Sequence, residues 1–465
     1  MTPTKRQGHK RRLPLKARVV AAAAALLLGG GGTAVIAANA SAGSAGKPSA
    51  RASDGAAGAA RTATTIACPD VGDRLREVPD PARQKVSEGL AELDAQVARA
   101  YELAAASGGD GRAVLGELKE QRSATIGRMA DAIGERSARP SDLTELSGCT
   151  SRQVRTEAAA DSGGEVRSPG KAMPGGPAPA DFADIRKAPA RPRPAARSGG
   201  STGTFTSSCG RNENGHFNSD NVIVTPGVSN GAHHTHDYVG NLSTTAFSSN
   251  ASLAAAGTTC TNGDLSTHYW PVLRLLDGKA APDANKPGGG HDGNMGKVLR
   301  PASVTLQFRG SPASKVTAMP RFLRIITGDA KAFTSGTGNA NASWSCVGFE
   351  DRQLKDKYPI CPDGADVVRT LAFQNCWDGR STDSANHRTH VAFARADGSC
   401  PRGFRAVPQL VQRITYDVPA GTAFAVDSFP EQLHKPVTDH GDFINVMPDA
   451  LMAKAVGCVN RGQRC

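Results

Sequence analysis

Ten cysteines constrain the fold of this chain more than any other feature of its sequence. Two of them precede residue 150 and the other eight follow residue 200, and none are spaced as Cys-x-x-Cys, which disfavours a cysteine zinc site. An even number of cysteines is typical of exported, disulfide-bonded proteins. The simplest pairing joins neighbours along the chain: Cys68–Cys149, Cys209–Cys260, Cys346–Cys361, Cys376–Cys400 and Cys458–Cys465.

The amino terminus predicts export. A basic stretch precedes a short apolar core at residues 19–28, and an Ala-x-Ala site ends at Ala40. These are the three parts of a secretory signal peptide, which we expect to span residues 1–40. The alternative, an uncleaved membrane anchor, is less favoured because a span needs about twenty apolar residues. We therefore expect a secreted protein without membrane association after cleavage; the oligomeric state is left open.

The formal net charge of +12 is concentrated outside the predicted folded regions. The first 40 residues carry seven Lys or Arg and no acid, and residues 151–204 carry a further basic excess. The remainder is close to neutral. Because nucleic-acid binding needs a clustered basic face, we expect no nucleic-acid partner.

Composition divides the chain into segments. Residues 41–65 are rich in Ala, Gly and Ser and are expected to be disordered, and residues 151–204 form a Pro/Ala/Arg-rich linker. Between them, residues 66–150 have two runs of helical period, with Val86, Leu90 and Leu93 on one stripe. This pattern predicts a helical hairpin domain tied by Cys68–Cys149. It contains no histidine or tryptophan, so we interpret it as a spacer or interaction module.

Residues 205–465 are predicted to be mainly β. Short apolar runs separated by Gly, Pro, Asn and Asp are typical of a β-sandwich, here expected to be jelly-roll-like. A short helix is expected at residues 448–458. The runs that we interpret as strands are 221–226, 303–308, 322–327, 367–373, 389–394, 410–418 and 422–429.

Histidines gather in the same region, which holds ten of the eleven in the chain. In an extended segment His234 and His236 share one face, because strand side chains alternate. His-x-His is a spacing at which one strand offers two imidazoles to one metal ion. The two other clusters consist of His387 with His390 and of His440 with Asp442.

Three roles stay open for these residues: a divalent-metal site, metal-free acid/base chemistry, or hydrogen bonds that hold loops together. In an enzyme, His234 or His236 would be the base and Asp442 or Asp237 would orient it. The candidate catalytic residues are His234, His236, Asp237, His387, His390, His440 and Asp442. The candidate metal ligands are His234, His236, His390 and His440. The candidate substrate-binding residues are Tyr238, Tyr269, Trp270, Trp377 and Asp378.

Several segments follow one another in a specific order: "VTPGVSNGAHHTHDYVGN", "CTNGDLSTHYWPVL", "CWDGRSTDSANHRTHVAFA" and "DHGDFINVMPDALMAKAVGC". They resemble the secreted domain of unknown function numbered nineteen ninety-six, over about residues 205–460. The resemblance implies that His234, His236, Asp264, His387, His390, His440 and Asp442 belong to the family pattern.

Members of that family are exported and sometimes joined to carbohydrate-binding modules. The resemblance therefore implies a secreted protein that binds or acts on extracellular polysaccharide or cell-wall polymer, as a hydrolase or lyase if it is an enzyme. Two alternatives remain: a non-catalytic surface or wall protein, and a metal-binding protein without turnover.

Overall fold

The computed structural model describes residues 62–106, 111–155, 176–190, 199–279, 281–362 and 364–465. The expected signal peptide, and residues 41–61 of the segment expected to be disordered, lie outside them. The described residues belong to one compact unit. None of their helices is both long and apolar enough to cross a membrane.

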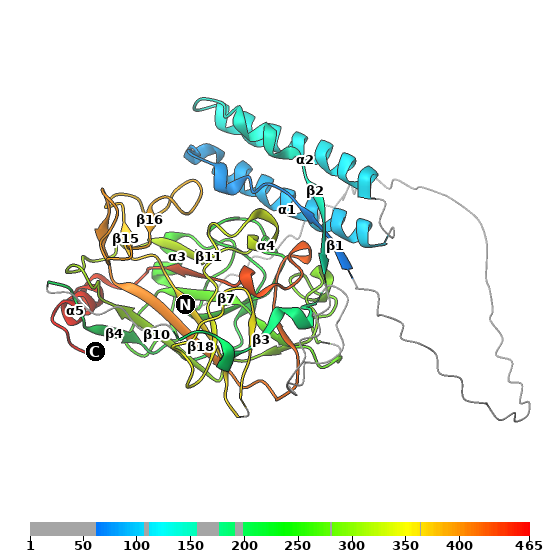
Figure 1. The fold of residues 1–465 in the computed structure, drawn as a ribbon. Coiled ribbons are helices and arrows are strands. Elements are labelled where there is room, and N and C mark those ends of the chain that lie inside the picture. Colours follow the sequence, from blue (N-terminus) through cyan, green and yellow to red (C-terminus); the bar gives the residue numbers. More distant parts are fainter. Residues whose placement is uncertain (1–61, 107–110, 156–175, 191–198, 280, 363) are drawn as a thin grey trace, which may run out of the picture. The chain divides into compact units, whose positions relative to one another are not determined.

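The helical unit, defined here as described residues 62–155, contains the expected hairpin (Figure 1). Helices α1 (Arg83–Ala106) and α2 (Gly111–Gly134) pack through Leu90, Leu93, Ile126 and Met129. An antiparallel pair of strands, β1 (Thr62–Ala67) and β2 (Thr150–Arg155), brings the ends of the unit together beside Cys68–Cys149. These strands were not predicted: β1 begins inside the segment expected to be disordered, and β2 begins at the last residue of the expected hairpin domain and continues into the expected linker. Short 3-10 helices are η1 (Gly72–Arg74), η2 (Asp80–Ala82) and η3 (Asp142–Ser147).

The rest of the described chain is mainly β, as predicted, and its centre is two five-stranded sheets. The first has the order β12-β14-β18-β10-β4 and the second β11-β20-β7-β6-β5. Apolar side chains from both sheets form one buried core that includes Phe308, Leu371, Trp270 and Phe443. The strands of the first sheet are β4 (Thr204–Ser207), β10 (Ser303–Arg309), β12 (Trp344–Cys346), β14 (Val367–Ala372) and β18 (Gln409–Tyr416). Those of the second are β5 (Phe217–Asn218), β6 (His236–Gly240), β7 (Thr267–Pro271), β11 (Arg324–Gly328) and β20 (His440–Ile444).

Smaller elements surround the two sheets. The predicted final helix is confirmed as α5 (Asp449–Asn460). One three-stranded sheet contains β8 (Leu273–Leu275), β9 (Lys297–Leu299) and β19 (Phe424–Val426). Another contains β15 (Cys376–Trp377), β16 (Val391–Ala392) and β17 (Arg405–Ala406). The remaining elements are β3 (Phe182–Asp184), β13 (Tyr358–Ile360), α3 (Asn250–Ala255), α4 (Ala332–Ser335), η4 (Pro179–Asp181), η5 (Ile185–Lys187), η6 (Gly290–Asp292), η7 (Pro430–Gln432) and η8 (Pro436–Thr438).

Residues 221–226 were predicted to be a strand, and that prediction is wrong. The Asn221 side-chain oxygen accepts hydrogen bonds from the backbone N–H groups of Ile223 (3.1 Å) and Val224 (3.0 Å). This is the local turn that asparagine favours. Val222 and Ile223 are buried all the same, so the apolar pattern indicated burial correctly and the element type incorrectly.

Part of the expected linker is also folded, which corrects its interpretation as a solvated spacer. Strand β3 pairs in parallel with β13, and Ile185 is fully buried. Asp181 accepts a hydrogen bond from the Lys435 ammonium at 2.6 Å, with both side chains buried. The proline-rich composition indicated a spacer over the whole segment. However, a few of its apolar and charged residues pack against or form ion pairs with residues of the β region.

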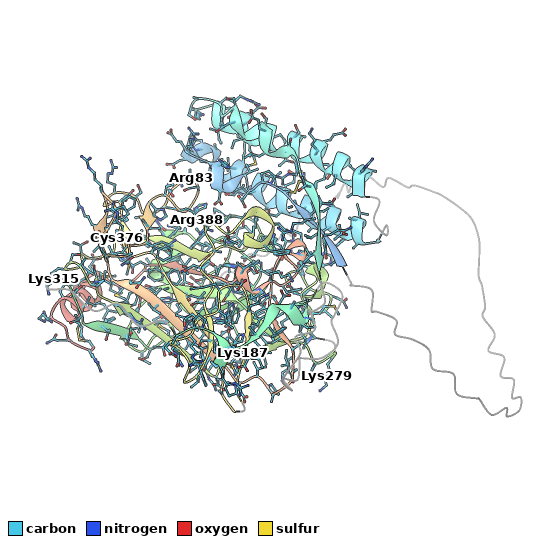
Figure 2. All side chains as sticks on the ribbon, viewed as in Figure 1. Arg83, Lys187, Lys279, Lys315, Cys376 and Arg388 are labelled. Carbon is cyan, nitrogen blue, oxygen red and sulfur yellow. A yellow bond between two sulfur atoms is a disulfide. The ribbon has the colours of Figure 1, made fainter. Side chains whose placement is uncertain are left out.

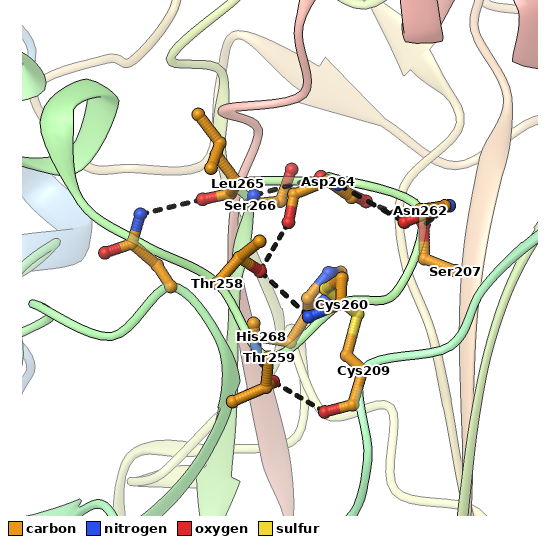
Figure 3. Close-up of a disulfide and its surroundings, with 12 residues drawn as sticks. Ser207, Cys209, Thr258, Thr259, Cys260, Asn262, Asp264, Leu265, Ser266 and His268 are labelled. Carbon is orange, nitrogen blue, oxygen red and sulfur yellow. Dashed lines mark hydrogen bonds between the residues drawn. A yellow bond between two sulfur atoms is a disulfide. The ribbon is translucent and has the colours of Figure 1, made fainter.

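The five disulfides join the predicted pairs. Figure 3 shows one of them, Cys209–Cys260, within a polar network. Asp264 accepts hydrogen bonds there from the Ser207 hydroxyl (2.7 Å) and the Ser266 backbone (2.9 Å). Asp264 therefore orders the chain near this disulfide.

Candidate metal centre

Three histidine side chains meet at the ends of two strands of the second sheet. The Nε2 atom of His234 lies 3.0 Å from Nε2 of His236 and 3.3 Å from Nε2 of His440. His234 precedes β6, His236 is the first residue of β6, and His440 is the first residue of β20. All three side chains are buried. Within the described part of the chain, this is the one cluster of His, Cys, Asp or Glu that could hold a metal ion.

Backbone carbonyls fix which nitrogen points into the cluster. Nδ1 of His236 donates to the Asp220 carbonyl and Nδ1 of His440 to the Thr438 carbonyl, both at 3.0 Å. With Nδ1 carrying the proton, Nε2 of both rings presents a lone pair to the centre of the cluster. Metal-bound histidines are held in the same way by a hydrogen bond from the other ring nitrogen.

The spacing of these nitrogens fits a shared ion better than a hydrogen-bonded group. Zinc–nitrogen bonds of about 2.0–2.1 Å in a tetrahedral site put neighbouring nitrogens about 3.3 Å apart. Without an ion, an N–H on Nε2 of His234 can donate a good hydrogen bond to only one of the two neighbouring imidazoles. The Nε2 lone pair of the other imidazole is then left without a donor. His234, His236 and His440 would each have a partner for Nε2 if they held one divalent ion between them.

Burial also keeps the three rings neutral. It lowers the pKa of His234 and His236 well below the usual value, with the neighbouring imidazoles adding to the effect, and lowers the pKa of His440 to about 4. Neutral imidazole is the form that binds metal. The cluster can therefore bind a cation at neutral pH without first losing protons.

Two features of neighbouring strands position His440. Gly328 pairs with His440 across β11 and β20 and has φ +79°, and a Cβ at that position would lie 2.4 Å from the Asp439 carbonyl oxygen. Arg369 forms a buried ion pair with Asp439 and donates to the Pro271 carbonyl at 2.8 Å. Since Pro271 pairs with His236, Arg369 ties together the strand ends that carry two of the histidines.

Asp442 lies two residues after His440 on β20, fully buried. Neither of its carboxylate oxygens has a hydrogen-bond partner among the described residues. Burial raises the pKa of Asp442 to about 8, against the opposing charge of Arg388. A buried carboxyl without partners is costly, so this group suits a site that receives a cation or a water molecule.

These groups form the floor of a cavity of about 710 Å³, a volume that includes its open mouth. We call His234, His236, His440 and Asp442 the floor. His234, His440 and Asp442 line the cavity itself, and His236 completes the cluster behind them. The rim is defined as the five charged lining side chains that form partly exposed ion pairs: Asp70, Asp73, Asp94, Lys331 and Arg388.

His387 also lines this cavity, and it lines a neighbouring groove of about 1460 Å³ as well. Its Nδ1 pairs with both carboxylate oxygens of Asp383, at 2.9 and 3.0 Å. Burial alone would raise the pKa of Asp383, but His387 outweighs it and lowers the pKa. His387 has φ +55°, an uncommon backbone conformation for a residue with a side chain. The dyad thus leaves Nε2 of His387 available at the cavity wall.

Two candidates fall outside this group. His390 was predicted to be a ligand, but its Nε2 bonds to the Arg324 carbonyl (2.7 Å) and its Nδ1 to the Ser384 hydroxyl (2.9 Å). Both nitrogens are used, so His390 holds a loop. Asp237 points to the opposite face of β6 and accepts from the Asn212 amide at 2.7 Å. Burial raises the pKa of Asp237 to about 7. Neither residue lines the cavity.

The aromatic candidates for substrate binding do not line the cavity either. Trp270, Tyr238 and Tyr269 are buried, and the two tyrosine rings pack against His236. Trp377 donates to the Ser381 carbonyl at 2.7 Å. Asp378 accepts from the backbone N–H groups of Arg380 and Ser381, as in a tight turn. Their positions correspond to packing and turn roles. Trp270 packs in the apolar core, where its Nε1 has no hydrogen-bond partner among the described residues.

Sequence reasoning missed the rim and the positioning role of Arg369. An arginine inside the apolar run 367–373 was a signal for a buried ion pair. The rim gave no signal, because its acids come from the helical unit and its cations from the β region. Figure 2 labels Arg388, whose Nε lies 3.7 Å from Asp73.

Comparison with protein-family models finds a match over part of the chain. Residues 221–446 match the model of a family described as "Domain of unknown function (DUF1996)". The matched region holds all four floor residues and the two rim cations, whereas Asp70, Asp73 and Asp94 precede it. No curated protein and no solved structure matches the chain.

Proposed function

We propose, from the geometry of the floor, that the protein is a metal-dependent hydrolase. Through residues 221–446 it belongs to the DUF1996 family, whose description assigns no activity. The observation that carries the proposal is the convergence of three Nε2 atoms at 3.0 and 3.3 Å beside a cavity. Three histidine ligands with one open position are typical of catalytic rather than structural zinc sites.

A divalent ion held by these three nitrogens would activate water and polarise the oxygen of a carbonyl or phosphoryl group. The chain's own residues supply the remaining parts. In the same cavity, Asp442 offers a carboxyl group without a hydrogen-bond partner among the described residues; once ionised beside a bound cation, it would be suited to accept a proton from water. His387, oriented by Asp383, offers Nε2 at the cavity wall, suited to protonate a leaving group.

Polysaccharide remains the proposed substrate on the resemblance alone. Phe429 is the only phenylalanine, tyrosine or tryptophan among the described residues lining the cavity, so stacking on sugar rings adds little support. We propose an extracellular location, supported by five disulfides and no free cysteine among the described residues.

Metal binding is tested first. Elemental analysis and calorimetric titration of Zn²⁺ into metal-free protein should give one tightly bound ion per chain. The His236→Ala variant should lose it. His233→Ala is the matched control, because His233 is adjacent to the cluster but pairs with Asp292 at 2.8 Å instead. Equal zinc binding by wild type and His236→Ala would overturn the proposal.

Turnover is tested separately with zinc-loaded protein on an activated ester, a phosphodiester and a panel of cell-wall polysaccharides. Hydrolysis that disappears in His236→Ala and persists in His233→Ala supports an enzyme. Stoichiometric zinc without hydrolysis of any probe would leave a metal-binding protein without turnover and exclude the hydrolase.

A further inference from the structure

The helical unit supplies part of the wall of the metal cavity. Asp70, Gly72, Asp73, Leu90 and Asp94 line the cavity together with the floor residues. All five precede the region that matches the family. The cavity of this chain is thus partly closed by a segment that its family domain does not include.

Lys331 connects the two segments at the mouth. Its ammonium lies 2.7 Å from Asp94 and 3.1 Å from Asp70. The same ammonium lies 5.5 Å from the centre of the Phe429 ring, which in turn packs edge-on against His234. Burial alone would lower the pKa of Lys331, but the two aspartates outweigh it and raise the pKa. The Phe429 ring therefore lies between this ion pair and His234, a candidate metal ligand.

A second connection lies beside it. Asp73 pairs with Arg388 at 3.7 Å and accepts a hydrogen bond from the Asn339 amide at 2.9 Å. Arg388 also donates to the Gly328 carbonyl at 2.9 Å, on the strand that pairs with His440. Both connections are made by charged groups, whose attraction weakens as salt rises.

The apolar groups of the helical unit pack mainly on one another. Its largest apolar cluster includes Leu90, Ile126 and Met129, and among the described residues of the β region, only Val224 and Ala385 are apolar side chains that pack against it. The unit is also closed on itself by Cys68–Cys149. A body with its own core can separate without exposing a large apolar surface.

We propose that the helical unit is a lid over the metal cavity, held shut by the ion pairs of Lys331 and Arg388. The proposal rests on the proposed function for its biological purpose. Opening exposes the floor to metal and substrate, and closing shields it from water and competing ligands. The rim thereby controls how fast ligands enter and leave.

The test compares Lys331→Met with Lys85→Met. Lys85 pairs with Glu135 at 3.3 Å inside the helical unit, so the control makes the same substitution without touching the β region. Two rates are measured: removal of bound Zn²⁺ by EDTA, and modification of His234 and His440 by diethyl pyrocarbonate in metal-free protein, read by peptide mass. Both should rise about tenfold or more in Lys331→Met and stay near wild type in Lys85→Met.

Sodium chloride at 1 M should accelerate both rates in the wild-type protein. Asp94→Asn replaces Lys331→Met if circular dichroism shows that the latter is unfolded. Unchanged rates in the folded rim variant, together with no effect of salt, would overturn the lid. If the wild type binds no zinc, the proposed function fails, and the modification rates alone still decide whether the lid exists.

Discussion

The floor of the cavity is built from neutral groups, whereas its rim is built from charges. On the floor, backbone carbonyls of Asp220 and Thr438 hold His236 and His440, and buried strands fix their positions. On the rim, Lys331 faces two aspartates across separate segments of the chain. Neutral donors in a rigid frame suit a site that must hold one geometry. Ion pairs near the surface suit a contact that forms and breaks.

This difference predicts that the floor sets the equilibrium of metal binding and the rim sets its rate. The two regions can be separated experimentally, because each has variants that leave the other intact.

Replacing His440 by Ala should weaken zinc binding by several hundredfold, on the order of 100- to 1,000-fold. Structural zinc sites contribute about 10–16 kcal/mol over four ligands, so one ligand accounts for roughly 3–4 kcal/mol. Lys331→Met should change the equilibrium constant less than about tenfold. Calorimetric titration with a competing chelator measures both variants. A rim variant that weakened binding as much as the floor variant would erase the distinction.

Glu431, which lies beside the rim, should make the stability of the protein depend on pH. Its carbonyl accepts from Thr65 of the helical unit, and its side chain lines a space beside Asp70, Asp94, Arg122 and Lys331. Burial raises the pKa of Glu431 to about 7, with the charge of Asp94 adding to it. The pKa of Glu431 is higher in the folded protein than in the unfolded chain. Its contribution to the free energy of unfolding is therefore full below about pH 4.5 and is lost as pH rises through 7.

Glu431→Gln should therefore gain stability relative to wild type as pH rises, by up to about 3 kcal/mol between pH 5 and 8. Urea unfolding at several pH values measures this difference. Tyr101 and His233 also interact with Glu431, so their replacement by Phe and Asn serves as a control. A pH-independent difference between wild type and Glu431→Gln would contradict the assignment.

His387 lies between floor and rim, and its replacement tests whether the cavity wall takes part in chemistry. His387→Gln should lower kcat about a hundredfold, with zinc stoichiometry unchanged. Asp383 pairs with Nδ1 of His387, and His390 lies close enough to interact with this ring electrostatically. Asp383→Asn should reproduce part of the loss through misorientation of the ring. Wild-type kcat in both variants would assign the dyad a structural role.

His390 provides the smallest functional effect. Replacing it by Ala removes the hydrogen bond to the Arg324 carbonyl and the contact with the Ser384 hydroxyl, which keeps other partners, and should cost roughly 1–3 kcal/mol of folding free energy. Zinc affinity should stay at the wild-type value, because both ring nitrogens of His390 already have protein partners. Loss of zinc binding in a folded His390→Ala protein would show instead that His390 is a metal ligand.

Local sequence patterns determined much of the framework. Helical period indicated α1 and α2, alternation and turn residues indicated a mainly β region, and proximity along the chain gave the five disulfides. The pairing of His234 with His236, and of His440 with Asp442, followed from side-chain alternation alone. These features depend on residues close together in sequence, where short-range geometry limits the alternatives.

The tertiary structure decided which of the histidines converge. His390 and His440 looked alike in sequence, but the hydrogen bonds of their nitrogens depend on where distant carbonyls lie: Arg324 for one and Thr438 for the other. The rim depended even more on long-range packing, since Asp94 meets Lys331 across more than two hundred residues. No local pattern encodes such a contact. It arises only when separate segments have folded and their charges find partners at a common surface.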